Sequence, residues 1–286
     1  MLYALLARAA PTAVVFRRGP SKQVLLIRWN TANDTFDEGQ WLKARIYERR
    51  CDLSPDGELL LYFAASHRKP YYSWSAVSKP PYLTALALWP KGDAWGGGGH
   101  FVTRSRIALN HRENEMALAE DFVTPKWLAI TPLGKHSGWG EDNPVWALRL
   151  ERDGWGLVSA GRLSEKDDAN VMIRYDPPIV WEKPHPVAPE QYTLQMAILG
   201  IKQRNGPWYL TTHTVFSGAN ESHRLGITDW ADWSASGDLL YSKAASLYRV
   251  EYSRGRLEQA RELINFADRA FEARESPRAA QVWPKR

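Results

Sequence analysis

Hydrolytic chemistry in this sequence would depend on carboxylates. A glycoside hydrolase needs an acid and a base or nucleophile on opposite sides of the bond that it breaks. Asp52, Asp229 and Asp232 lie on strand-like segments and are the candidates for these roles. Asp52 and Asp232 also occupy equivalent positions in an internal repeat, and an Asp repeated beside a turn usually fixes that turn by hydrogen bonding. The structural role is the favoured interpretation.

The segment 45–50 is the best candidate for binding an anion. Side chains alternate along a strand, so Arg45, Tyr47 and Arg49 are predicted to share one face. Two guanidinium groups and a phenol suit an acidic partner, and the innermost strand of a ring of sheets would present them to the central channel. The competing interpretation pairs these arginines with acidic residues of neighbouring sheets.

Aromatic residues are abundant, with 14 Trp beside 12 Tyr and 8 Phe. Most of them are expected in the core, because aromatic residues favour half-buried sheet faces. Some lie in a segment rich in proline and basic residues (66–82), and others flank a run of four glycines. Exposed aromatic side chains carry much of the energy of protein interfaces. The predicted partner-binding residues are Tyr71, Tyr72, Trp74, Trp95 and His100.

Motifs for other chemistries are missing from the sequence. The run Gly96–Gly99 lacks the Lys and Ser/Thr of a P-loop and is interpreted as a flexible hairpin loop or as bare backbone that a ligand approaches. No HExxH pair occurs among the seven histidines, and no GxSxG elbow is present. The single Cys51 forms neither an intrachain disulfide nor a cysteine-based metal site. The sequence predicts no metal and no cofactor, and it favours a non-catalytic protein.

Short β-type runs separated by turn signals dominate the chain, and sustained helical periodicity is scarce. The turns at Pro55-Asp56-Gly57, Asp153-Gly154 and Asn205-Gly206 suit tight hairpins, because Asp-Gly and Asn-Gly accept positive φ. Gly19-Pro20-Ser21 marks a further turn. The predicted strands are 12–18 with 23–29, 48–54 with 58–65, 84–90, 100–109, 145–151 with 155–161, 193–202 with 208–216, and 229–234 with 238–245, 246–252 and 260–266.

An internal repeat organises these runs. The stretch 50–65 aligns without gaps to 230–245, and seven of the sixteen positions agree, among them Ser54 with Ser234 and Gly57 with Gly237. Repeats at a multiple of a fixed period are typical of propellers and solenoids. An offset of 180 residues (230 − 50) fits three periods of about 60, so the 286 residues hold about five repeats.

The fold class predicted from this pattern is all-β: a single β-propeller domain over residues 1–286, with five four-stranded antiparallel blades and six blades as the runner-up. The first repeat lacks an initial strand in this interpretation, and the tail 270–277 is predicted to supply it and close the ring. Two long inserted loops, 66–82 and 110–143, are expected, the second with a short helix at 113–121.

The turn Leu53-Ser54-Pro55-Asp56-Gly57 and the strand after it resemble the repeats of TolB-type and WD-repeat-like propellers. The stretch 232–239 is similar to a degenerate copy of the same turn. A wider pattern resembles a group of uncharacterised bacterial propeller-like proteins. The resemblance implies the architecture and leaves the function open. The wider pattern consists of the segments 27–41, 45–57, 82–101 and 263–277.

Composition narrows the classes of function. The 37 basic and 32 acidic residues give a net charge of +5 that is spread along the chain, whereas nucleic-acid binders concentrate their charge in a patch. No apolar run reaches the length of a membrane span, and the chain is expected to be cytoplasmic. The favoured function is a protein-interaction module or scaffold whose partner is another protein. The alternatives are a five-bladed hydrolase acting on a carbohydrate or small molecule and a nucleic-acid-binding ring.

Overall fold

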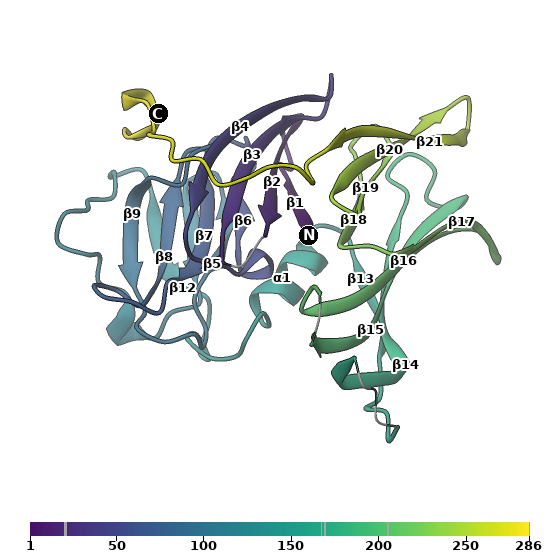
Figure 1. The fold of residues 1–286 in the computed structure, drawn as a ribbon, viewed down its shortest axis with the longest axis horizontal. Helices are drawn as coiled ribbons and strands as arrows, with labels where there is room; N and C mark the ends of the chain where they lie inside the picture. The colour runs from purple at the N-terminus through teal and green to yellow at the C-terminus, as the bar shows by residue number, and fades with distance from the viewer. Residues whose placement is uncertain (20–21, 167, 169, 205, 286) are drawn as a thin grey trace. The chain divides into compact units, whose positions relative to one another are not determined.

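The computed structural model describes residues 1–19, 22–166, 168, 170–204 and 206–285 (Figure 1). The chain forms two compact units, which are described separately: unit 1 comprises Met1–Tyr3 and Leu150–Arg269, and unit 2 comprises Ala4–Arg149 and Ala270–Arg286. The described residues form five β-sheets and one α-helix, so the all-β class is confirmed. Within these ranges no helix is long and apolar enough to cross a membrane.

The first sheet of unit 2 runs in chain order through four strands. The predicted hairpin at 12–18 and 23–29 appears as β2 and β3, although Pro20 and Ser21 of its turn lie outside the described residues. The expectation that this sheet lacks its first strand is wrong, because the N-terminal residues form β1, whose first residues belong to unit 1. The strands are β1 (Leu2–Leu6), β2 (Thr12–Arg18), β3 (Val24–Asn30) and β4 (Thr35–Leu42).

A second and a third sheet complete unit 2. In the second sheet β5, β7, β8 and β9 are neighbours and β6 also pairs with β7; in the third, β11 pairs antiparallel with β10 and parallel with β12. Trp89 and Phe101, one from each sheet, are almost fully buried in a common core. The strands are β5 (Arg45–Ile46), β6 (Asp52–Leu53), β7 (Leu60–Ala65), β8 (Ser73–Ser78), β9 (Ala85–Pro90), β10 (Gly99–Thr103), β11 (Arg106–Leu109) and β12 (Ala129–Pro132).

The two predicted inserted loops both contain regular structure. The segment 66–82 holds β8, which pairs with β7 on one side and β9 on the other, so it is not one loop. The segment 110–143 contains β12 and a 3₁₀ turn, Glu113–Glu115, where a longer helix was expected. Small and polar residues form β8 because they lie between two apolar strands, an effect of tertiary pairing that overrides local propensity.

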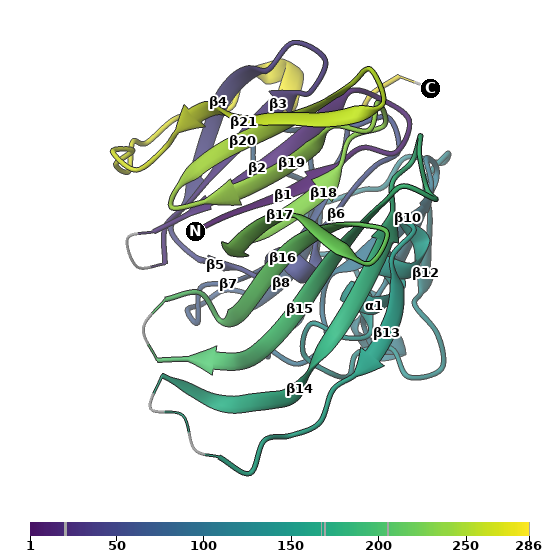
Figure 2. The same cartoon turned by 90° about the vertical axis from the view of Figure 1, so that its right-hand side faces the viewer.

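Unit 1 consists of two meandering sheets, of five and four strands, each in chain order (Figure 2). The turn predicted at Asn205-Gly206 falls between β15 and β16, and Asn205 lies outside the described residues. The strands are β13 (Gly156–Ala160), β14 (Val171–Pro184), β15 (Tyr192–Gln203), β16 (Tyr209–Ser217) and β17 (Asn220–Ile227), followed by β18 (Trp230–Trp233), β19 (Leu239–Lys243), β20 (Ser246–Ser253) and β21 (Arg256–Asn265).

The segment 145–151 is helical, so the strand predicted there is wrong. Helix α1 covers Val145–Arg152, with Pro144 directly before it and Gly154, at φ +90°, just beyond its end. Proline at the start and glycine after the end are the usual signals of a helix. Trp146 and Leu150, four residues apart, are both buried, which is a helical spacing.

The internal repeat corresponds to a repeated hairpin. Both copies form the first tight turn of an antiparallel meander, at β6–β7 and at β18–β19. In each copy the glycine N–H bonds the serine carbonyl, from Gly57 to Ser54 at 2.8 Å and from Gly237 to Ser234 at 3.0 Å. Both glycines have positive φ and both serines are buried. The two matching stretches therefore share their turn chemistry and their place in a sheet.

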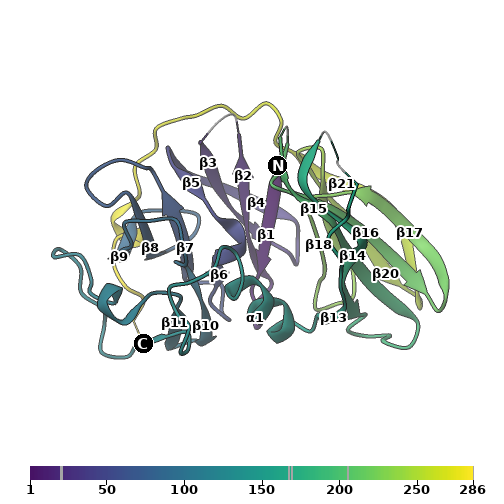
Figure 3. The same ribbon diagram turned by 90° about the horizontal axis from the view of Figure 1, so that it is seen from below.

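The C-terminal tail is not a strand, so the closing strand predicted at 270–277 is wrong. Figure 3 draws the yellow chain after β21 as irregular, with a 3₁₀ turn at Arg278–Ala280. Within unit 2 the tail is fixed by side chains. The Phe271 ring lies 6.1 Å from that of Trp41, and the Trp283 ring lies 5.9 Å from that of Trp127.

Candidate functional site

Three exposed aromatic side chains stand on loops of unit 2. Trp139 is 59% exposed, Trp95 56% and Tyr72 45%. We call the loops that carry them the aromatic loops. Two of these residues were predicted to bind a partner, whereas Trp139 was missed because it lies in a long segment without a local signal. The other predicted residues, Tyr71, Trp74 and His100, are half-buried, the last two on strands β8 and β10.

Backbone hydrogen bonds make the aromatic loops neighbours. The N–H of Gly96 donates to the carbonyl of Gly140 at 2.7 Å, and each of these glycines directly follows an exposed tryptophan. Ser73, which follows Tyr72, accepts a bond from the N–H of Lys91 at 2.9 Å and donates its hydroxyl to the carbonyl of Asp93. The three exposed rings therefore arise from backbone segments that are bonded to one another.

The glycine run fills a tightly packed site. All four glycines from 96 to 99 are buried, which argues against the interpretation as a flexible hairpin loop. A Cβ on Gly97 would lie 2.2 Å from the ring of Phe63, and one on Gly98 would lie 2.1 Å from the carbonyl oxygen of Arg50. The chain's own atoms occupy the space that a ligand would need beside these glycines. Their positive φ values, +79° and +72°, also favour glycine.

Arg50 joins two of the aromatic loops from inside. Its side chain is 3% exposed, and its Nε donates to the Asp142 carboxylate at 2.9 Å. The same guanidinium donates to the carbonyls of Ala94 at 2.8 Å and Gly96 at 2.7 Å. A buried guanidinium with several acceptors fixes the geometry around it, because each broken bond would leave a buried polar group unsatisfied.

The predicted anion-binding face forms only in part. Strand β5 ends at Ile46, and the 3₁₀ turn Glu48–Arg50 follows, so the alternation that would align Arg49 with Arg45 is lost. The Arg45 guanidinium lies 4.5 Å from the Tyr47 ring centre, and that of Arg49 lies 4.6 Å from the ring of Trp146. Both arginines therefore stack on aromatic rings, an arrangement that neither interpretation of the sequence included.

A buried serine and histidine lie beneath the glycine run. His111 Nε2 is 2.8 Å from Ser75 Oγ, and its Nδ1 donates to the carbonyl of Glu115 at 3.0 Å. Ser75 also accepts the N–H of Gly98 at 2.7 Å. Burial lowers the pKa of His111, which disfavours the protonated ring. Ser75 has no exposed surface, so these bonds support the loop and do not form an accessible nucleophile.

Each candidate carboxylate already has a structural partner. Asp52 accepts the N–H of Phe101 at 2.7 Å, and Asp229 accepts that of Leu2 at 3.0 Å. Asp232 pairs with Lys183 at 2.6 Å, and burial raises the pKa of its carboxyl. These contacts agree with the structural interpretation of the repeated aspartates.

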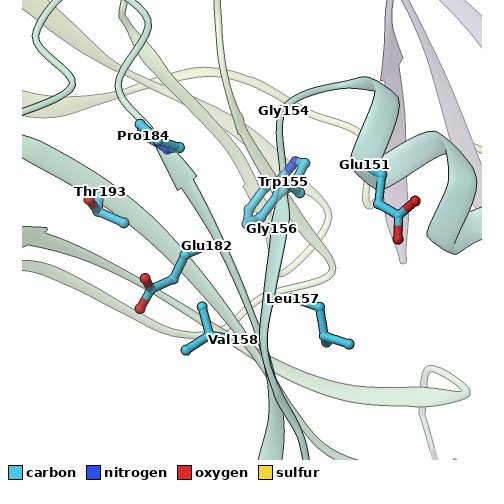
Figure 4. Close-up of a pocket in the computed structure, with 9 residues that line it drawn as sticks. All are labelled: Glu151, Gly154, Trp155, Gly156, Leu157, Val158, Glu182, Pro184 and Thr193. Carbon is cyan, nitrogen blue, oxygen red and sulfur yellow. The ribbon is translucent and has the colours of Figure 1, made fainter.

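A groove of about 500 Å³ lies in unit 1 beside β13, and two carboxylates line it (Figure 4). Glu182 accepts a hydrogen bond from Gln195 at 2.9 Å, and Glu151 comes from the last turn of α1. Among the residues that the structure describes, no group of three His, Cys, Asp or Glu side chains could hold a metal ion. The lining residues are Glu151, Gly154, Trp155, Gly156, Leu157, Val158, Glu182, Pro184 and Thr193.

Comparisons were made with protein-family models, curated proteins and solved structures. No family model, no curated protein and no solved structure matches this chain.

Proposed function

We propose that this chain is a non-catalytic interaction module that binds another protein through the aromatic loops. The observation that carries the proposal is the exposure of Trp95 and Trp139, at 56% and 59%, on backbone that buried glycines and Arg50 hold in place. Large aromatic side chains dominate the binding energy of interfaces. Their fixed backbone reduces the ordering entropy that a partner would otherwise have to offset.

The chemistry of the partner follows from the charge beside these rings. The Arg112 guanidinium lies 4.4 Å from the centre of the Trp139 ring and 3.8 Å from the Glu115 carboxylate, and its side chain is 37% exposed. An apolar or aromatic anchor with an acidic neighbour would contact the rings and the guanidinium together. We therefore expect a protein segment of that composition.

The scaffold in this proposal is a propeller-type fold of five blades, with six as the runner-up. Five sheets support it, as do the meandering order of the β1–β4, β13–β17 and β18–β21 sheets and the repeated hairpin. The likeness of that hairpin to TolB-type and WD-repeat-like propellers belongs to the same proposal. In such folds, loops at the ends of the blades carry binding residues on a rigid frame.

Selection from a random peptide library on the whole chain tests the proposal. We expect peptides with an apolar anchor beside an acidic residue, whose affinity falls at least about tenfold for W95S and for W139S. The matched control is V282S, which alters an exposed apolar residue, 52% accessible, outside the aromatic loops. Selected peptides that bind all three variants like the parent chain would refute the proposal.

The hydrolase remains a second proposal, supported by the groove of Figure 4. Glu151 and Glu182 line it together with Trp155, a combination that suits a carbohydrate. Release of sugar from an oligosaccharide panel, abolished in E151Q and E182Q, would support it, and no release by the parent chain would count against it. A nucleic-acid-binding ring is the third proposal and predicts steeply salt-dependent binding.

A further inference from the structure

The β13–β17 sheet of unit 1 has two unlike faces. Along β15, Leu194, Met196 and Ile198 are buried, and the residues between them, such as Gln195 and Ala197, are half-buried. The buried face packs within unit 1, where Lys183 of β14 pairs with Asp232 of β18. We call the other face, with Gln195 and Ala197, the accessible face. A sheet face that leaves apolar side chains exposed marks a candidate interaction surface.

One row of the accessible face carries opposite charges at its two ends. Glu182 lies directly opposite Gln195, Gln195 opposite Thr214, and Thr214 opposite Arg224. Residues that are directly opposite in a sheet share a face. Three strand spacings separate the carboxylate on β14 from the guanidinium on β17, which is about 14 Å.

The next row has apolar residues at both ends. Val180 lies opposite Ala197, Ala197 opposite Thr212, and Thr212 opposite Ile227. Ile227 is 63% exposed, although isoleucine is among the residues most often buried. In both rows the two end residues lie at equal distances from the midline between β15 and β16. The end residues of one row are oppositely charged, and those of the other row are both apolar.

We propose that a second copy of this chain packs on the accessible face. A two-fold axis parallel to the strands, between β15 and β16, exchanges the position of β14 with that of β17. It places Glu182 of each copy over Arg224 of the other, and Val180 over Ile227. A two-fold interface requires this kind of self-complementarity. The proposal does not depend on the aromatic loops, which belong to unit 2.

An existing ion pair does not prevent this contact. Arg224 bonds Glu221 at 3.0 Å, but the two side chains are 73% and 45% exposed. An exposed pair of this kind contributes little free energy, whereas a pair covered by a second sheet is screened less. The face is small for an interface, so we expect a dissociation constant on the order of 10 µM.

Charge reversal tests the dimer in the full chain. Sedimentation velocity at about 1 to 200 µM should show a concentration-dependent dimer. E182R and R224E should each raise the dissociation constant at least about tenfold, because like charges then meet twice across the axis. The double variant E182R/R224E should return to within about threefold of the parent, because the opposite charges are restored.

R256E is the matched control, since it makes the same change of charge at a residue of β21 whose side chain is 67% exposed. It should leave the dissociation constant within about twofold of the parent value. Circular dichroism would confirm that each variant is folded. A parent chain that stays monomeric at every concentration would overturn the proposal. A dimer that neither single reversal weakens would also overturn it.

Discussion

Gly98 shows why particular residues, and not loop length, determine the backbone of the candidate site. Its N–H donates to Ser75, its carbonyl accepts from Asn110, and a Cβ would lie 2.1 Å from the carbonyl oxygen of Arg50. The backbone around Gly98 cannot move without breaking the bonds from the buried Arg50 guanidinium to the carbonyls of Ala94 and Gly96. The position is therefore restricted to glycine by space as well as by φ.

Replacing Gly98 with alanine should destabilise unit 2 strongly. Gly92→Ala is the matched control, because Gly92 has a similar φ of +80° and nothing within 4 Å of the added Cβ. We expect G92A to cost about 1 kcal/mol from backbone strain and G98A to cost about 2 to 4 kcal/mol more. Urea unfolding measures both. Equal losses for the two variants would contradict the packing argument.

His185 predicts a loss of stability at acidic pH. The ring is buried, its Nε2 donates to the carbonyl of Gly237 at 2.8 Å, and its Nδ1 accepts the N–H groups of Val187 and Ala188. A proton on Nδ1 would face those two donors in a buried site, and burial lowers the pKa of His185 below its usual 6.5.

Because the unfolded chain takes up the proton more readily, His185 contributes stability above pH 6.5 that is lost as the pH falls toward its lower folded pKa. The urea midpoint should therefore decrease from about pH 7.5 to about pH 5.5, and less steeply in H185F, whose ring keeps the aromatic contacts. The same slope in parent and variant would show that other groups titrate.

The C-terminal tail, residues 270–286, lies across unit 2, and we call it the strap. Ser276 bonds Thr84 at 2.8 Å, Gln40 donates to the carbonyl of Arg274 at 3.0 Å, and Trp283 reaches the core cluster of the second and third sheets. These contacts connect the tail to β4, to the loop before β9 and to the core. The contribution expected from a closing strand comes instead from side chains.

Deleting residues 270–286 should lower the melting temperature of unit 2 by about 5 to 10 °C, because the deletion uncovers apolar surface at Trp41 and Trp127. Differential scanning calorimetry measures the shift. E275Q, which changes an exposed tail side chain, should leave the melting temperature unchanged. An unshifted transition in the deleted chain would mean that the strap contributes nothing.

The strands and turns that could be predicted are those whose sequence signals lie within a few residues of one another. Strands β2 and β3 and the hairpin turn at Pro55-Asp56-Gly57 were predicted, because alternation and Asp-Gly turns act within a few residues. Strand β14 was missed because Asp176-Pro177-Pro178 suggests a break, whereas the strand continues through an irregularity in register between Arg174 and Ile179. A strand was predicted at 145–151, whereas Pro144 before the segment and Gly154 after it were the better guide to α1.

The candidate site was less predictable, because tertiary contacts assemble it. Tyr72 and Trp95 were selected as exposed aromatics, but nothing local links them to Trp139, which reaches them through the bond from Gly96 to Gly140. Arg50 falls in the predicted strand 48–54, and the 3₁₀ turn Glu48–Arg50 brings it instead beneath the aromatic loops. Such contacts join residues about 40 or more positions apart, beyond the range of local patterns.

Neither compact unit is formed by one continuous stretch of chain. Met1–Tyr3 belongs to unit 1, where Leu2 bonds both Asp229 and Ser242, and the tail returns to unit 2 after Arg269. Each unit therefore needs a segment from a terminus of the chain.

The claim that the aromatic loops are held rigidly is tested most directly by amide hydrogen exchange of the full chain. The N–H groups of Gly96, Gly97 and Gly98 donate to the Gly140 carbonyl, the Asn110 carbonyl and the Ser75 hydroxyl, and all three glycines are buried. Protection as strong as that of β7 and β8 is the predicted result. Exchange at the rate of an unstructured loop would contradict the account, because the exposed tryptophans would then have no fixed support.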